Sequence, residues 1–513
     1  MPIIEVLYAV CGVLLSLYGL NCLILTGLYL RSRRNTPAEP PSPAEWPRVT
    51  VQLPIYNELH TAERLLITVA GLDYPRDRLE IQALDDSTDS TRTLVAQVVE
   101  RLHQQGIDIV HVTRQDRTGF KAGALAAGMV QVKGELIAIF DADFLPEPDF
   151  LRRVVPHFAD PKVGCIQTRW GHVNRDTSAF TQTQALGSDG HFVVEQGARS
   201  RSGLFMNFNG TAGMWRRACI EDAGGWQGDT LTEDLDLSYR AQLRGWRFVY
   251  LPHVVVPAEL PPQISALRRQ QARWAQGSIQ TAVKNLPRLL RSNQPWTVKI
   301  EGVVHLCGYA VHPLMLGLIL LTFPMSLSHS WILLVAPWLM VTAIGPSLMC
   351  SVAQAADGPG WQRRLRWLPL LVMLGMGLSL SNTGAVLRGL FGVHQDFQRT
   401  PKFDLRKSGD TWVTSAYALR GNALVWVELG LAALVLAMLA MPGMRWTSAP
   451  WLLLYAGGFG YVATLDLYQA YQLHRWQAAR YSGTGYSAGR FSGIDHNKRV
   501  PGKSGRFEPE RRG

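Results

Sequence analysis

The chain has 513 residues, of which 47% are hydrophobic, and its formal net charge at pH 7 is +11. This length exceeds what one hydrophobic core usually organises, so two or more structural units are expected. The basic residues gather beside apolar segments and in the C-terminal tail, which indicates a membrane surface and argues against a nucleic-acid partner. Residues 3–30 and much of 303–470 are strongly apolar, whereas 31–300 has the mixed composition of a soluble domain. The sequence therefore predicts a membrane protein with a large soluble part.

The N-terminal segment 1–30 is expected to be an uncleaved transmembrane anchor. Its apolar stretch is too long for a signal-peptide core, and it ends in Arg31-Ser32-Arg33-Arg34. Since basic residues favour the cytoplasmic side, residue 31 onward is expected in the cytoplasm. Five prolines between 35 and 47 indicate that 31–47 is a linker. We expect a multi-pass integral protein of the inner or plasma membrane, with its soluble domain in the cytoplasm.

Residues 48–300 alternate between short β-rich runs and helix-like stretches. The β-rich runs are Val49–Leu53, Leu79–Leu84, Ile107–Val112, Glu135–Phe140 and Val163–Thr168, and the helix-like stretches include Glu58–Leu72 and Gly119–Val132. This alternation predicts an α/β domain whose largely parallel sheet has helices on both faces. Ligands bind such sheets at the carboxyl ends of the strands. Asp86 and the pair Asp141 and Asp143 follow strands directly, so we expect them at that edge.

Beyond residue 300 the chain is expected to cross the membrane four more times. The apolar stretches are 304–326, 330–351, 422–442 and 448–470, each near the ~20 residues that a bilayer requires. The stretch 366–390 is more polar and has basic residues on both flanks, which favours an interfacial helix, although a further crossing is the alternative. The expected units are 301–352 (two spans), 353–421 (interfacial helix and loop), 422–472 (two spans) and 473–513 (a basic, disordered cytoplasmic tail).

An acidic pair follows the apolar run that ends at Phe140. The carboxylates of Asp141 and Asp143 are two residues apart, and such oxygen ligands suit Mg²⁺ or Mn²⁺ bridged to phosphate. A solvated turn is the alternative, since this motif alone is common.

Two further motifs offer groups for catalysis. Asp234, in Thr232-Glu233-Asp234, stands at the start of a helix-like run, where it is either a general base or a helix-capping residue. Gln270-Gln271-Ala272-Arg273-Trp274 combines an amide, a permanent positive charge and an aromatic face, which suit a diphosphate and a sugar ring. An amphipathic interfacial helix would use the same residue types.

The motifs together resemble a known family. In order and rough spacing they are Pro54-Ile55-Tyr56-Asn57-Glu58, Asp85-Asp86-Ser87, Asp141-Ala142-Asp143, Thr232-Glu233-Asp234 and Gln270-Gln271-Ala272-Arg273-Trp274. Over about 48–400 this set resembles the processive family-two glycosyltransferases, which include cellulose, hyaluronan and chitin synthases. The segments Gly119–Leu125, His191–Gln196 and Phe208–Gly213 are similar to the plant cellulose-synthase-like A and C proteins. The resemblance implies a GT-A (Rossmann-like) fold beside an α-helical transmembrane domain, inversion at the anomeric carbon, and extrusion of the product through the membrane.

The resemblance also implies roles for single residues. Tyr56, Glu58, Asp86 and Lys121 would line the nucleoside pocket, Asp141 and Asp143 would hold the metal, Asp234 would be the base, Gln270 and Arg273 would face the diphosphate, and Trp274 would stack on the acceptor. Asn209, Gly210 and Thr211 would form the acceptor motif, where cellulose synthases have a cysteine in place of Asn209. Phe397, Thr400 and Lys402 match a gating loop that covers the nucleotide, and an ordinary basic linker is the alternative.

The expected function is processive transfer of a hexose from UDP-glucose or GDP-mannose onto a β-linked polysaccharide, with Mg²⁺ or Mn²⁺ and with translocation across the lipid bilayer. Two alternatives remain at this stage. One is a lipid glycosyltransferase of the ceramide-glucosyltransferase kind, which shares much of the motif set. The other is a non-catalytic membrane scaffold, which the complete set of acidic residues disfavours. The donor sugar and the linkage stay open, because motifs do not fix the contacts that select them.

Overall fold

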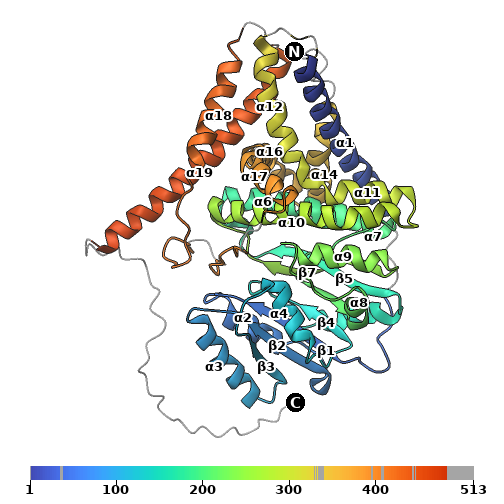
Figure 1. Cartoon of the computed structure of the whole chain (residues 1–513). Helices are drawn as coiled ribbons and strands as arrows, with labels where there is room; N and C mark the ends of the chain where they lie inside the picture. The colour runs from blue at the N-terminus through green and yellow to red at the C-terminus, as the bar shows by residue number, and fades with distance from the viewer. Residues whose placement is uncertain are drawn as a thin grey trace, which may run out of the picture.

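A seven-stranded sheet forms one half of the molecule, and a bundle of helices forms the other (Figure 1). The computed structural model describes residues 2–34, 39–327, 330, 332, 340–393, 397–405, 410–441, 444 and 446–481. The expected tail beyond residue 481 and part of the span expected over 330–351 lie outside these residues. All of the expected site residues lie within them.

The sheet has the strand order β3-β2-β1-β4-β6-β5-β7. Its strands are β1 (Val49–Ile55), β2 (Leu79–Asp85), β3 (Ile109–Thr113), β4 (Leu136–Ile139), β5 (Val163–His172), β6 (Gly213–Arg216) and β7 (Arg247–Ala258). All neighbours are parallel except β6, which is antiparallel to β4 and β5. The five expected strands and the largely parallel α/β sheet are therefore confirmed.

Helices cover both faces of the sheet because alternate strand side chains enter two separate cores. On β4, Leu136 and Ala138 belong to one core, whereas Ile137 and Ile139 belong to the other. The helices of this half are α2 (Ala62–Ala70), α3 (Thr91–Gln104), α4 (Phe120–Met129), α5 (Phe150–Val154), α6 (Ala179–Asp189), α7 (Gln196–Arg201), α8 (Arg217–Asp222) and α9 (Glu233–Leu243). With both faces covered, the open place for a ligand is the edge where β1, β2 and β4 end.

Strands β6 and β7 were not expected from the sequence. β6 has only four residues, and its place in the sheet depends on pairing with β4 and β5, far away in the chain. β7 contains Pro252 and Pro257, which usually argue against a strand inside a sheet. Both strands therefore depend on tertiary contacts that local patterns do not reveal.

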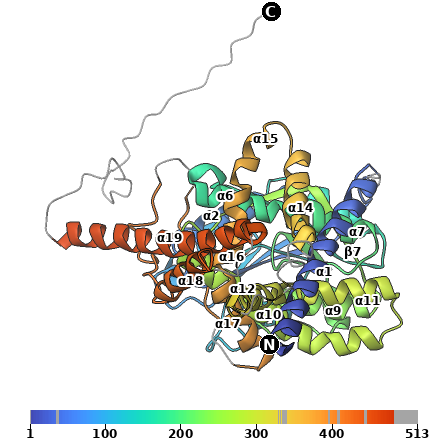
Figure 2. The same ribbon diagram turned by 90° about the horizontal axis from the view of Figure 1, so that it is seen from above.

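The other half consists of helices gathered over the sheet-bearing half, with α19 extending beyond them (Figure 2). They are α1 (Pro2–Ser32), α10 (Ile264–Arg291), α11 (Trp296–Leu306), α12 (Val311–Leu327), α14 (Ile344–Ala356), α15 (Trp361–Arg364), α16 (Leu368–Gly377), α17 (Ser379–Leu390), α18 (Val425–Met438) and α19 (Ala449–Tyr481). Among the described residues, 2–32 and 308–327 form helices long and apolar enough to span a membrane. The number of crossings and the boundaries of the expected units remain predictions.

Two elements of this half bear on the sequence analysis. The stretch expected to be interfacial is a pair of helices, 361–377 and 379–390, bent by 46° at the break. The polar side chains of α17 begin directly after this break, at Ser379. α19 continues to Tyr481, so the beginning of the segment expected as a disordered tail is helical.

Helix α10 lies between the two halves (Figure 1). Its buried Arg268 donates through Nη2 to Oε2 of Glu428 on α18 at 2.6 Å, and through Nη1 to Asp466 on α19. The carboxyl ends of the strands therefore face helix α10, which ion pairs connect to the helical bundle.

Candidate active site

A cavity of ≈ 650 Å³ opens at the carboxyl ends of β1, β2 and β4 and reaches α10 and the bundle. The expected site residues that line it are Tyr56, Glu58, Asp86, Lys121, Asp141, Asp143, Asn209, Gly210, Asp234, Gln270, Arg273, Trp274, Phe397, Thr400 and Lys402. Thr211 does not line the cavity. It is fully buried, and its Oγ1 accepts a hydrogen bond from the backbone N–H of Asp141 at 2.8 Å. Thr211 therefore supports the Asp141 backbone from behind, which differs from its expected contact with the acceptor.

Each carboxylate of the acidic pair is held by a lysine. Oδ1 of Asp141 accepts from Nζ of Lys121 at 2.6 Å. Oδ2 of Asp143 accepts from Nζ of Lys402 at 2.8 Å and from the backbone N–H of Glu259 at 3.0 Å. Oδ1 of Asp143 is buried and has no hydrogen-bond partner among the described residues.

These oxygens fit a divalent cation in part. Within the described part of the chain, no three His, Cys, Asp or Glu side chains converge as a ready-made metal site. Mg²⁺, however, is commonly bound through one or two carboxylates together with substrate phosphates and water. The unpartnered oxygen of Asp143, together with Asp141, matches that pattern, in which the substrate completes the shell.

Cations and an aromatic ring line the end of the cavity near β1 and β2. The guanidinium of Arg117 lies 3.3 Å from the centre of the Tyr56 ring, and Nε of Arg114 donates to Oδ1 of Asp86 at 3.0 Å. Glu58 forms an ion pair with Arg399 at 3.0 Å. Burial raises the pKa of Glu58 to about 8, although Arg399 and Lys402 act to lower it.

Asp234 stands in the first turn of α9. Its Oδ1 accepts from the backbone N–H of Leu235 at 2.8 Å, whereas the side chain of Thr232 makes no capping hydrogen bond. Burial, and next the neighbouring Glu233, raise the pKa of Asp234 to about 7. A carboxylate of this kind can take up a proton near neutral pH. Its bond to the helix backbone fits the capping interpretation, and the role of Asp234 as a base stays a prediction.

The loop beside Asp234 approaches it closely. Gly210 has a φ of +82°, and a Cβ at this position would lie 2.9 Å from Oδ2 of Asp234 and 3.4 Å from Nζ of Lys121. Lys121 also donates to the carbonyl oxygen of Gly210 at 2.9 Å. Glycine therefore gives the space in which Asp234, Lys121 and the loop meet.

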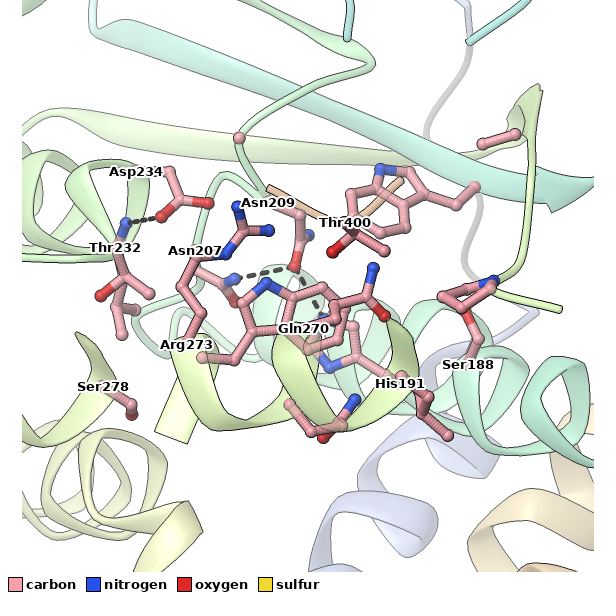
Figure 3. A pocket seen from close by; sticks show the side chains of 18 of the residues that line it. Ser188, His191, Asn207, Asn209, Thr232, Asp234, Gln270, Arg273, Ser278 and Thr400 are labelled. Atoms are coloured by element: carbon pink, nitrogen blue, oxygen red, sulfur yellow. Dashed lines mark hydrogen bonds between the residues drawn. The ribbon is translucent and has the colours of Figure 1, made fainter. Parts of the chain in front are cut away.

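Helix α10 presents three of the expected residues from one face. Gln270, Arg273 and Trp274 line the cavity, and Arg273 lies near Asp234 and Asn209 (Figure 3). Burial lowers the pKa of Arg273, whereas Glu233, Asp141 and Asp234 act to raise it. The Arg273 guanidinium lies 4.5 Å from the centre of the Phe397 ring.

Polar side chains around Asn209 form a second cluster. Oδ1 of Asn209 accepts from Nδ2 of Asn207 at 2.8 Å and lies 3.0 Å from Nε2 of His191 (Figure 3). Nδ1 of His191 lies 2.9 Å from Oε2 of Glu195, which also binds Arg199. Nδ2 of Asn209 is buried and has no partner in the described part of the chain. That amide can donate to a hydroxyl in the cavity.

The segment 397–405 lies across the site. Phe397 stacks on Phe120 with the ring centres 5.8 Å apart, and Lys402 holds Asp143. The backbone N–H groups of Phe403 and Asp404 donate to Glu259 at 3.0 and 2.7 Å. Burial raises the pKa of Glu259 to about 7.

Several residues of the site were not predicted from the sequence, among them Arg117, His191 and Glu259. Glu259 directly follows β7, which was itself not expected. His191 stands on a π-helical turn, Gly190–Glu195, within a helix, and such turns are frequent at functional sites. Arg117 lies two residues before Gly119, in a loop without any pattern that would indicate a ring contact.

Comparisons with known proteins give consistent matches. Residues 47–277 match the family described as glycosyltransferase-like family 2. Glucomannan 4-beta-mannosyltransferase 9 of Arabidopsis thaliana is 33% identical over 437 residues, which are 82% of this chain and 81% of that protein. Glucomannan 4-beta-mannosyltransferase 2 of the same plant is 38% identical over 353 residues, 68% of this chain and 66% of that protein. A mannosyltransferase from Pyrobaculum calidifontis, solved in complex with GDP-Man and Mn²⁺, superimposes with a TM-score of 0.48 at 22% identity, covering 76% of this chain and 100% of that one.

Proposed function

Because the chain belongs to the family-two glycosyltransferases and is a hexosyltransferase, we propose that it extends a β-linked polysaccharide from a nucleotide sugar. The observation that carries this proposal is Asp234. Its carboxylate has a pKa of about 7 and lies in one cavity with the lysine-held acidic pair and with the unpartnered amide of Asn209. Those three features correspond to a base, a place for the diphosphate and a place for the acceptor.

The proposed chemical step is a single displacement. An acceptor hydroxyl gives its proton to Asp234 while its oxygen attacks the anomeric carbon of the donor. The bond between that carbon and the diphosphate breaks on the opposite side, so the configuration inverts. The electron pair stays with the nucleoside diphosphate, whose negative charge Arg273 and Lys121 stabilise.

Asp141 and Asp143 would hold Mg²⁺ or Mn²⁺. A divalent ion, when bound, neutralises charge on the diphosphate oxygens. Lys121 and Lys402 each occupy one oxygen of a carboxylate, and the ion would use Oδ1 of Asp143, which has no partner among the described residues. Tyr56, Glu58 and Asp86 would contact the nucleoside, together with Arg117 over the Tyr56 ring.

The donor that we propose first is GDP-mannose, because the relatives are named as glucomannan mannosyltransferases. UDP-glucose is the second. Trp274 and Asn209, with Gly210, would contact the acceptor end of the polymer. The same cavity is also lined by His312 of α12, by Leu378 before α17 and by Asn382 within α17, so the product would leave through the bundle. We propose a multi-pass membrane protein whose soluble half lies in the cytoplasm.

The test uses the purified full chain with each nucleotide sugar and with Mg²⁺ or Mn²⁺. With one donor we expect a series of β-linked products of increasing length. Adding EDTA should abolish this series. The measurement is product length and linkage by mass spectrometry after digestion with linkage-specific glycosidases. One sugar added to a lipid, with no ladder, would contradict the polymerase.

A further inference from the structure

A second pocket, of ≈ 740 Å³, lies between α10, α17 and the segment that leads into α18. Its lining includes five arginines, Arg268, Arg269, Arg273, Arg388 and Arg420, and no acidic residue among the described ones. We name it the arginine pocket. It shares only Leu231, Arg273 and Phe397 with the main cavity, so it stands on the other side of Arg273 from Asp234.

Three of these arginines have no acidic partner among the described residues: Arg269, Arg388 and Arg420, of which Arg388 donates only to the neutral amide of Gln276 at 3.4 Å. Arg268 is offset by Glu428 and Asp466, and Arg273 faces the carboxylates of the main cavity. The side chains of Arg269 and Arg420 form no ion pair or hydrogen bond with any described residue, and both are exposed. Guanidinium groups converging from two elements without carboxylates suit a phosphate, which they can bind in bidentate fashion.

A helix end adds to this positive potential. Residues 421–424 line the pocket and lead directly into α18, which begins at Val425. The N-terminus of a helix carries a partial positive charge and attracts anions. The arginines and the helix end therefore favour the same kind of ligand.

The surroundings indicate which phosphate would bind. Phe391, at the end of α17, is 75% exposed, and Trp426, at the start of α18, is 68% exposed. Aromatic side chains beside basic residues are typical of the headgroup level of a membrane, where basic pockets between helices bind anionic lipids. A soluble nucleotide would not need this apolar border.

We infer that the arginine pocket binds the phosphodiester headgroup of an anionic phospholipid, with its acyl chains along Phe391 and Trp426. The inference rests on the membrane placement proposed above but not on the transfer reaction. The bound phosphate lies next to Arg273 and Phe397, so its lipid neighbours the diphosphate site without entering it.

The test measures lipid binding without any sugar donor. The full chain is purified in neutral detergent, and the melting temperature is followed while dioleoylphosphatidylglycerol is added in mixed micelles. We expect phosphatidylglycerol to raise the melting temperature, and we expect no such rise with dioleoylphosphatidylcholine. In the double variant Arg269→Gln and Arg420→Gln, the apparent affinity for phosphatidylglycerol should fall about tenfold or more. The matched control is Arg288→Gln with Arg291→Gln, two exposed arginines at the far end of α10.

Three results would overturn the inference. Wild-type affinity in the Arg269 and Arg420 double variant would show that the lipid binds elsewhere. Equal loss in the control pair would show an unspecific effect of charge. A rise in melting temperature with pyrophosphate, and none with phosphatidylglycerol, would assign the pocket to a soluble anion. The single variant Arg420→Gln, in an exposed loop, serves if the double variant folds poorly.

Discussion

The carboxylate of Asp234 combines two properties that a general base needs. It borders the cavity, and burial beside Glu233 raises its pKa to about 7. A base must be deprotonated to accept a proton, so a raised pKa makes the reaction sensitive to pH near neutrality. Arg273 and Lys121 then limit how far the pKa can rise, because they favour the charged form.

We therefore predict that kcat/KM for transfer rises with pH up to about 7 and is flat above, with a slope of about one in the logarithmic plot. Asp234→Asn should lower kcat by about 10²-fold or more, since it removes the proton acceptor and keeps the shape. Isothermal titration with the nucleoside diphosphate should give an almost unchanged affinity. Substantial polymer formation by this variant would exclude Asp234 as the base.

Gly210 lies close to the carboxylate of Asp234. A side chain at its φ of +82° is strained, and the added Cβ would lie 2.9 Å from Oδ2 of Asp234. We predict that Gly210→Ala costs about 1–2 kcal/mol of stability and also lowers kcat. Gly106→Ala is the matched control, because Gly106 has a φ of +80° with no atom within 4 Å of the added Cβ. Equal kcat values for the two variants, at equal melting temperatures, would contradict a role of this contact in positioning Asp234.

At the scale of elements, the segment 397–405 links the carboxylate of Asp143 to Glu259, directly after β7. Lys402 holds Asp143, while Glu259, directly after β7, holds the backbone at Phe403 and Asp404. The positive charge of Lys402 competes with a cation for the same carboxylate. A metal would therefore use Oδ1 of Asp143 beside Lys402, or take the place of Lys402 at Oδ2.

The competition between Lys402 and a metal cation for Asp143 can be tested without catalytic turnover. Lys402→Met should bind Mn²⁺ about tenfold more tightly than the wild type when no donor is present, because a cation near Asp143 is removed. The measurement is the free Mn²⁺ signal in electron paramagnetic resonance during a titration. Lys133→Met is the control, since it breaks a similar pair with Asp108 at 2.9 Å far from the cavity. Unchanged Mn²⁺ affinity in Lys402→Met would place the metal away from Asp143.

Patterns within short segments of the sequence predicted the strands and the helix start that depend mainly on those segments. Strands β1 to β5 and the start of α9 follow from apolar runs and from acidic residues at a helix start, so the positions of Asp86, Asp141 and Asp234 were predicted. β6 and the contact of Lys402 with Asp143 were not, because they join segments distant in sequence, 259 residues apart in the second case. The position of Thr211 differed for a related reason: it is fully buried and supports the backbone of Asp141, 70 residues away in the sequence.

For the whole molecule, α10 is the connection between the catalytic half and the bundle. One face carries Gln270, Arg273 and Trp274 into the cavity, and Arg268 reaches α18 and α19. The sequence indicated an amphipathic helix here, but it could not show that Glu428 and Asp466, in apolar segments, are its partners. One guanidinium balances the charge of two carboxylates buried in the bundle, and Asp466 also accepts from the hydroxyl of Ser265 at 3.2 Å.

Removing the Arg268 guanidinium should weaken the connection between the two halves and lower the stability of the protein. We predict that Arg268→Met lowers the free energy of unfolding by about 3–5 kcal/mol, because it leaves two buried carboxylates without a cation. Arg269→Met, one residue along and exposed, should change it by less than about 0.5 kcal/mol in lipid-free detergent. Chemical denaturation followed by tryptophan fluorescence provides the measurement.

A second set of variants separates loss of charge balance from loss of packing. Combining Arg268→Met with Glu428→Gln and Asp466→Asn removes all three charges and should recover most of the stability, since no buried charge remains unpaired. Nucleoside diphosphate affinity should stay near the wild-type value in the triple variant, because the facing side chains of α10 are unchanged. If the triple variant were as unstable as Arg268→Met alone, the connection between the halves would depend on the packing of the arginine side chain and not on its charge.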